Sequence, residues 1–333
     1  MAATMTIQDV QKAVDTYLAR NTKVLDANFA KALDVSINKY ARTVTKVKGQ
    51  YPQFHQLLGH VVQGFKAEWQ ELGQAEFKSK ILKNYHQKVN YPIVPAEILP
   101  SYLAELYEEG TPIQDKAIAK KIIEGMLAQV QDDLEYLSIK GVYDPANASG
   151  QFGKSLDGIE TVLNRIYADT THPAYKIPIN VPDANNILDE VTKFEKKLPK
   201  FFKQKVKRIF MSETNLERYM LKYEETFGRN TNYTDGKKMK TRFGREIVGI
   251  PGLSDAIIFA FPEGNLLKLV DIIDNPPRIT DTQVQDYKLK IFMEFWLGYD
   301  FAINEAVMIS NTTDATEGLG DAALMAKYYP HEA

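Results

Sequence analysis

The sequence predicts an α+β fold with long elements that project from a globular part. Three observations predict it. Residues 61–89 alternate between apolar and polar side chains as an extended two-stranded ribbon does, residues 111–140 carry the signals of one long helix, and residues 287–297 alternate as a long strand does. Short helices and short strands are interspersed among them, and this mixture is typical of an α+β chain.

The composition indicates a packed globular protein. The chain has 333 residues, of which 44% are hydrophobic and 25% charged, enough apolar area for one large core or two moderate ones. No apolar run approaches the roughly 20 residues that cross a bilayer, and residues 1–21 lack the pattern of a secretory signal. The chain has 0 Cys, which excludes disulfides and cysteine-ligated metals and fits a reducing cytoplasm.

The first sixty residues are predicted to be helical and amphipathic. Two apolar stripes at helical spacing carry this prediction: Ile7, Val10, Val14, Tyr17 and Leu18, and then Leu25, Phe29, Leu33, Ile37 and Tyr40. No apolar partner is evident nearby in the sequence. The helices are therefore either an arm that docks elsewhere or the lid of the main core.

Residues 61–92 are predicted to form an extended hairpin. Phe65 and Trp69 alternate with charged residues in the first strand, Gly73 centres the turn, and Phe77 and Tyr85 belong to the returning strand. At about 3.3 Å per residue the arms reach on the order of 35 Å, too far for an isolated hairpin to be stable in water. The ribbon needs a neighbouring surface to lie on.

A long helix is predicted after the prolines near residue 95. Thr111 suits the N-cap, Pro112 the first helical position, Gln114 completes a capping box, and Gly141 sits where a terminating glycine is expected. Roughly 28 residues at 1.5 Å each give a rod of about 42 Å. A turn-rich stretch follows at 143–153.

The rest of the chain alternates between helix and strand. Helices are predicted at 156–166 and 185–197, and after the N-cap residue Ser212. Strands are predicted at 206–211, 246–250, 256–261, 266–272, 287–297 and 301–310. The tail from Asn311 is small, polar and acidic, which favours a flexible end.

No catalytic or metal-binding motif is present. His55 and His60 are five residues apart without a carboxylate to complete a metal set, and the Asp132–Asp133 pair favours a solvated helix face. The basic loop 236–245 has too few aromatic residues for a specific nucleic-acid groove. Residues 193–245 hold 16 basic and 6 acidic side chains, whereas 254–333 hold 5 and 13, a bias that fits either solvated faces or head-to-tail subunit contacts.

The order of these elements, with several local phrases, resembles the Hong Kong phage capsid fold of tailed-phage major capsid proteins and encapsulins. The phrases are Ile209–Ser212 leading into a helix, Gly249–Pro251 before a strand, Pro262–Leu266 opening the next strand, and Asn304–Val307 near the end. The resemblance covers roughly residues 61–310.

The resemblance implies a division of the chain and a function. It gives a helical N-terminal arm at 1–60, an extended loop at 61–92, a peripheral domain with the spine helix at 93–155, an axial domain at 156–273, return strands of the peripheral domain at 274–310 and a C-terminal tail at 311–333. It implies a non-enzymatic subunit, with no cofactor or metal, that builds the icosahedral shell around the double-stranded DNA of a tailed phage. Phe65, Trp69, Phe77 and Tyr85 are then the expected inter-subunit contacts.

The same resemblance implies the partners. They are many copies of the chain in hexamers and pentamers, a separate scaffolding protein, a portal, decoration proteins and non-specifically contacted DNA, in a virion assembled in the host cytoplasm and without a membrane. Lysines on the ribbon are interpreted as ordinary protection of a strand edge, so cross-linking is not predicted. The alternatives are the shell of an encapsulin-type nanocompartment and a cytoplasmic α+β enzyme with an unrecognised site.

Overall fold

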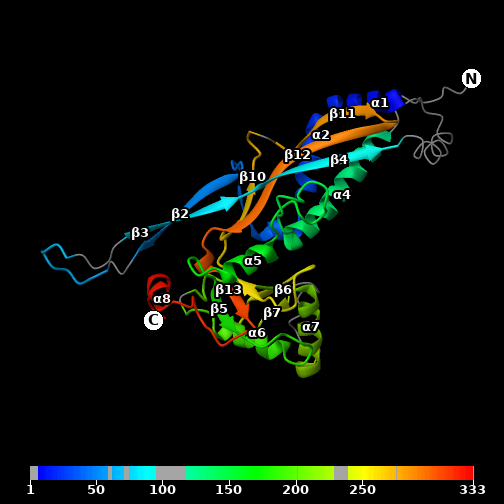
Figure 1. Cartoon of the computed structure of the whole chain (residues 1–333). Helices are drawn as coiled ribbons and strands as arrows, with labels where there is room; N and C mark the ends of the chain where they lie inside the picture. Colours follow the sequence, from blue (N-terminus) through cyan, green and yellow to red (C-terminus); the bar gives the residue numbers. More distant parts are fainter. Residues whose placement is uncertain are drawn as a thin grey trace, which may run out of the picture.

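A computed structural model describes residues 7–58, 62–70, 75–94, 118–200, 202–228, 239–274 and 276–332 of the chain. The protein consists of an elongated upper unit and a lower unit, with a thin ribbon that leaves the upper unit at one end (Figure 1). The upper unit holds a five-stranded sheet and the lower one a six-stranded sheet. The sequence-based expectation of an α+β fold is confirmed.

One long strand, β12 (Lys288–Phe301), organises the upper sheet. Its antiparallel neighbours are β4 (Tyr85–Ile93), β10 (Leu266–Val270) and β11 (Arg278–Gln285), and β1 (Arg42–Val44) pairs in parallel with β10. Every second side chain of β12 from Leu289 to Leu297 is buried in the main core. The period-two pattern therefore predicted this strand correctly, although it continues four residues further.

The spine helix α4 (Ile118–Lys140) covers the buried side of this sheet. It ends at Lys140, directly before Gly141, as predicted. A Cβ at Gly141 would lie 2.5 Å from the Leu156 carbonyl oxygen, so the close approach of the following chain requires glycine there. The predicted start at Thr111, Pro112 and Gln114 lies outside the described residues. The turn-rich stretch 143–153 follows the helix as expected.

The N-terminal helices α1 (Ile7–Arg20) and α2 (Thr22–Ala32) lie against α4. Val14 and Phe29 are buried in the same core as α4, so these helices cover the main core. A 3-10 helix, η1 (Ser36–Tyr40), is the last helical element within the first sixty residues. The expectation of helix does not hold beyond it, since β2 (Gln50–Leu58) is a strand.

The lower sheet has the strand order β5-β13-β9-β6-β8-β7. Its strands are β5 (Tyr175–Pro178), β6 (Arg208–Ser212), β7 (Met239–Lys240), β8 (Glu246–Ile250), β9 (Phe259–Ala260) and β13 (Met308–Asn311). The remaining helices are α5 (Ile159–Ala168), α6 (Ile187–Lys196), α7 (Glu213–Phe227) and α8 (Ala322–Tyr328). Ser212 caps α7 as predicted, because its hydroxyl accepts a hydrogen bond from the Asn215 backbone N–H at 3.1 Å.

Stacked phenylalanines join the two units. The rings of Phe210 and Phe261 lie 4.8 Å apart with planes at 3°, and Phe301 from β12 meets Phe261 edge-on at 5.5 Å. Aromatic pairs of this kind contribute beyond their buried area. The upper and lower units therefore share a packed contact.

Three elements differ from the sequence-based expectations. The predicted strand 301–310 is interrupted by a 3-10 turn, η3 (Asn304–Ala306), and β11 was not expected. The predicted flexible tail is wrong, because α8 follows and Tyr329 is only 3% exposed. The Tyr329 hydroxyl donates to the Glu305 carbonyl oxygen at 2.5 Å, which fixes the tail to the body.

Candidate assembly surface

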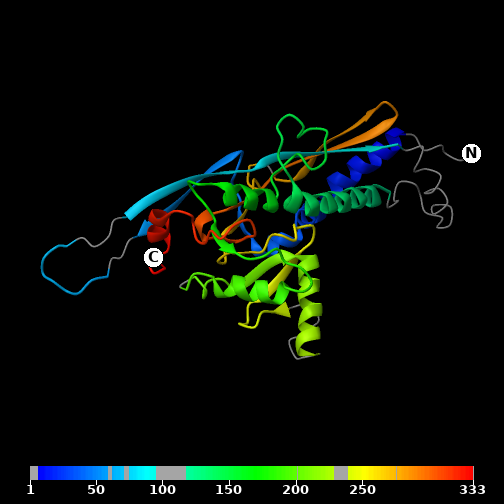
Figure 2. The same ribbon diagram turned by 60° about the horizontal axis from the view of Figure 1, so that its bottom comes forward.

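The ribbon is formed by β2 and β3 (Ala75–Lys83), which pair antiparallel from Gln50 opposite Lys83 to Leu58 opposite Ala75. It extends away from both units in two views (Figures 1 and 2). A two-stranded ribbon is present, but two parts of the predicted hairpin at 61–92 are wrong. The predicted first strand at 65–70 is not a strand, and the predicted returning strand leaves the ribbon after Lys83, since Tyr85 belongs to β4 of the upper sheet. Residues 62–70 contain no strand, and the predicted turn at Gly73 lies outside the described residues.

The two faces of the ribbon differ in exposure. Successive residues of a strand point to opposite faces, and the register places Pro52 opposite Ile81 and Gln56 opposite Phe77 on one of them. On this outer face Phe54 is 62% exposed, Phe77 71% and Ile81 59%. Apolar side chains that stay this exposed along one face mark a contact surface.

The segment 62–70, beyond the two strands, exposes still larger side chains. Val62 is 89% exposed, Phe65 97% and Trp69 95%. A large aromatic side chain buries 150–250 Å² when it is covered, so these residues carry a large unused hydrophobic contribution. Together with the outer face they form the surface that we call the ribbon surface, made of Pro52, Phe54, Val62, Phe65, Trp69, Phe77 and Ile81.

The inner face is held to the body by Lys80. Its Nζ donates to Asp300 Oδ1 at 2.6 Å, to the Phe301 carbonyl oxygen at 2.8 Å and to Asn304 Oδ1 at 2.6 Å. Burial lowers the pKa of Lys80, and Asp300 opposes that shift. The inner face of the ribbon therefore lies against its own subunit at the end of β12, while the outer face stays open.

Fixed contacts hold the junction between the ribbon and the sheet. Asn84 stands between β3 and β4, accepts from the Gly49 backbone N–H at 2.7 Å and donates to the Val47 carbonyl oxygen at 2.6 Å. Gly298 of β12 passes so close that a Cβ would lie 2.6 Å from the Lys83 carbonyl oxygen. The direction in which the ribbon leaves the body is therefore set by polar contacts and by a close approach of two backbones.

The four residues expected to make contacts between subunits do not share one environment. Phe65, Trp69 and Phe77 are open on the ribbon surface. Tyr85 is half-buried in its own chain, where its ring lies 4.4 Å from that of Tyr143 and its hydroxyl donates to Asp157 Oδ2 at 2.6 Å. Burial, and then this carboxylate, raise the pKa of Tyr85.

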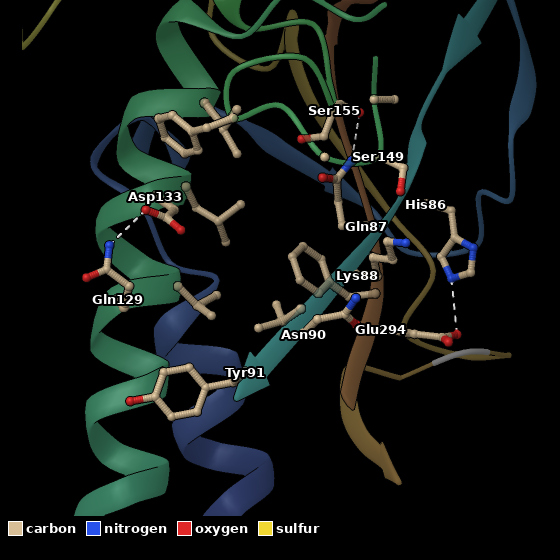
Figure 3. Close-up of a pocket in the computed structure, with 18 of the residues that line it drawn as sticks. His86, Gln87, Lys88, Asn90, Tyr91, Gln129, Asp133, Ser149, Ser155 and Glu294 are labelled. Atoms are coloured by element: carbon tan, nitrogen blue, oxygen red, sulfur yellow. Dashed lines mark hydrogen bonds and ion pairs between the residues drawn. The ribbon is translucent and has the colours of Figure 1, made fainter. Parts of the chain in front are cut away.

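A groove of about 640 Å³ lies between α4, β4 and the turns at 148–155 (Figure 3). Met126, Val130 and Phe295 supply apolar walls. The polar rim is internally paired, since Gln87 donates to the Ser155 carbonyl oxygen at 2.9 Å and Gln129 to Asp133 Oδ1 at 2.9 Å. The groove is thus suited to receive apolar side chains.

The histidine and the arginines considered above for metal or nucleic-acid binding have structural partners. His55 lies on the ribbon beside Tyr328, Arg245 is turned inward to Glu195 at 2.5 Å, and Arg242 lies over the Phe227 ring. His60 and residues 236–238 of the basic loop are outside the described part of the chain. Within that part there is no group of three or more His, Cys, Asp or Glu that could hold a metal, and no helix there is long and apolar enough to cross a membrane.

Sequence reasoning missed Phe54, Ile81 and the Lys80–Asp300 pair. Phe54 belongs to a strand that Pro52 makes hard to recognise, because proline is rare inside strands. A pairing between residues 220 apart leaves no local pattern. The alternation of Phe77 and Ile81 with lysines predicted the strand itself, but Ile81 was not among the expected contacts.

Comparison with solved structures identifies the fold, although no family model and no curated sequence matches. A chain of the satellite phage P4 procapsid, which includes the size determination protein, has a TM-score of 0.51 at 9% identity and covers 87% of this chain and 99% of its own. A chain of Gordonia phage Cozz has a TM-score of 0.51 at 11% identity, with coverages of 83% and 86%. The capsid of an empty GTA particle has a TM-score of 0.50 at 12% identity, with coverages of 83% and 89%. The chain therefore has the fold of phage capsid proteins, the fold that its sequence resembles.

Proposed function

We propose that the protein is the major capsid protein of a tailed phage, which assembles with copies of itself into the icosahedral shell around the DNA. The observation that carries the proposal is the ribbon surface, which projects from the body with Phe65 and Trp69 almost fully exposed. The fold supports it, because the similar solved structures include a phage procapsid and a GTA capsid. In this role the protein needs no catalysis.

Covering the ribbon surface drives assembly. Each Å² of apolar area removed from water contributes about 25 cal/mol, and a subunit in a closed shell makes several such contacts at once. Closed symmetry ensures that every ribbon finds an equivalent neighbour. We infer that Phe65, Trp69 and Phe77 contact adjacent subunits, whereas Tyr85 mainly holds β4 to its own body.

The proposed role carries with it a division of the chain, a set of partners and a location. The division into arm, extended loop, peripheral domain, axial domain and tail follows from it, with β2 as the first strand of the extended loop. Hexamers and pentamers of the chain, a separate scaffolding protein, a portal and decoration proteins are its proposed partners. Its proposed location is the virion, assembled in the host cytoplasm around non-specifically contacted DNA.

The test is assembly of the purified chain, followed by light scattering and electron microscopy. We expect closed shells, and we expect Phe65→Ser with Trp69→Ser to leave folded subunits that stay small. Phe243→Ser is the matched control, because Phe243 is also exposed, at 56%, but lies away from the ribbon. Normal shells from the double variant, or a chain that stays monomeric at high concentration with its scaffolding protein present, would overturn the proposal.

The contents of native particles test the finer assignment. DNA inside them is the expected result. Particles that instead enclose an enzyme would identify a nanocompartment with the same shell fold.

A further inference from the structure

The inner face of the ribbon meets the C-terminal helix α8, a contact far apart in sequence. Lys327 Nζ of α8 lies 2.9 Å from Glu76 Oε2 of β3. His55 Nε2 of β2 lies 2.9 Å from the Tyr328 hydroxyl, with ring centroids 6.0 Å apart. Both strands of the ribbon are thus bound to one short helix, which lies beside the ribbon in Figure 2.

The buried carboxylate of Glu305 connects this contact to the body of the protein. The Glu305 side chain is 1% exposed and lies with Oε1 2.9 Å from His172 Nδ1. Tyr328 hydrogen-bonds the same carboxylate, and the Tyr329 hydroxyl binds the Glu305 carbonyl oxygen. A continuous set of polar contacts therefore runs from His55 on the ribbon through Tyr328 to Glu305 in the body.

The hydrogen-bond partners of Tyr328 and His55 determine where the protons of these two side chains lie. Burial, and then Glu305, raise the pKa of Tyr328, so its hydroxyl keeps the proton and donates it to the carboxylate. His55 Nε2 then donates to the Tyr328 oxygen, and His55 Nδ1 carries a lone pair. That Nδ1 is buried and has no hydrogen-bond partner among the described residues.

We propose that α8 is a clasp that holds the ribbon along its own subunit, and that protonation of His55 opens it. A proton on Nδ1 places a buried N–H without an acceptor at the contact, a costly arrangement. Opening frees the part of the ribbon beyond Lys80, where Glu76 and His55 lie, while Lys80 and Asn84 still hold its base to the body. The ribbon surface is exposed with the clasp closed as well, so the clasp controls how rigidly that surface is held in one direction for a partner.

The charged groups around His55 favour its neutral form when the clasp is closed. Lys78 and Lys80 from β3 and His172 from the body oppose a positive charge on the ring, Glu305 favours it, and burial is the largest effect, so the pKa of His55 is lowered. Glu76 is already paired with Lys78 and Lys327.

The sign of the pH dependence follows from this shift. An open ribbon has a His55 near its ordinary pKa of about 6.5, so it takes up a proton at a higher pH than the closed one. Closure is therefore strongest above about pH 6.5 and weakens as the pH falls below it.

Hydrogen exchange of the full chain, kept dilute and unassembled, tests the clasp. Tyr328→Phe removes both hydrogen bonds of the hydroxyl and is expected to speed exchange of the β2 and β3 amides about tenfold at pH 7.5. Tyr287→Phe, at an exposed turn, is the matched control. Exchange in β8 reports whether the variant stays folded, and Lys327→Ala gives a second way to weaken the same contact.

A pH series isolates the part played by His55. Between pH 7.5 and 5.5, amide exchange corrected for its intrinsic pH dependence should rise in β2 and β3 of the native chain and stay flat in His55→Phe. Equal protection of the ribbon in Tyr328→Phe, Lys327→Ala and the native chain would overturn the clasp. The same pH response in His55→Phe would overturn its opening by His55. Neither outcome depends on whether the chain forms shells.

Discussion

Lys80 of the ribbon and Asp300 of β12 form a buried ion pair, with Nζ 2.6 Å from Oδ1 and side chains only 13% and 5% exposed. The second oxygen of Asp300 accepts from Arg165 Nη2 at 3.0 Å, and Arg165 also reaches Asp157 at 3.2 Å. Asp300 therefore stands between a cation from the ribbon and a cation from α5.

This arrangement predicts unequal effects of removing the two partners. Asp300→Ala leaves the Lys80 ammonium buried without a counter-charge and should lower the free energy of unfolding by about 3–5 kcal/mol. Lys80→Ala leaves Asp300 paired with Arg165, so the loss should be only about 1–2 kcal/mol. Urea denaturation followed by circular dichroism measures both. Equal losses, or a larger loss for Lys80→Ala, would contradict the bridging role of Asp300.

Two glycines near the spine helix predict opposite responses to alanine. A Cβ at Gly158 would lie 2.5 Å from the Ile139 carbonyl oxygen, whereas at Gly125 inside α4 nothing lies within 4 Å. Gly158→Ala should cost about 2 kcal/mol through overpacking, and Gly125→Ala should gain up to about 1 kcal/mol through helix propensity. Thermal unfolding of the two variants gives the comparison. A stabilised Gly158→Ala protein would show that α4 and α5 are less tightly apposed than described.

The lower core predicts a loss of stability at alkaline pH. Tyr219 is 2% exposed, and burial, followed by the charge of Glu195, raises its pKa to about 12. Its contribution to stability is complete below the unfolded pKa of about 10 and is lost as the pH rises from about 10 to 12. Tyr219→Phe should therefore unfold less readily than the native chain at pH 11 and similarly at pH 8. The measurement is the urea midpoint at both pH values, and an unchanged difference between the two proteins would refute the prediction.

The elements predicted correctly are those whose pattern is set by one buried face. Leu289, Ile291 and Met293 alternate because one side of β12 faces the core, and Ser212 precedes α7 because a cap is a local feature. Such signals lie within a few residues of one another. They are therefore visible in the sequence without knowledge of the fold.

The failures share a physical cause, which is that the deciding contact is distant or absent. Phe65 and Trp69 alternate with charged residues as a strand does, yet both are almost fully exposed and no described residue covers them, so the alternation does not reflect a buried face. Tyr329 orders the polar tail through Glu305 and the Phe202 ring, 5.0 Å away between centroids. Neither relationship can be read from neighbouring residues. The candidate surface was therefore predicted in kind, but its first strand and its anchors were not.

The pairing of β4 with β12 has a mechanical consequence. The chain of β3 continues through Asn84 into β4, and β4 pairs with β12 over nine residues, from Tyr85 opposite Leu297 to Ile93 opposite Leu289. A pull along the ribbon is thus directed along the strands, so it loads their inter-strand hydrogen bonds in shear and all together instead of peeling them apart singly. A force that an adjacent subunit exerts on the ribbon is therefore transmitted through β4 to β12, in the middle of the sheet.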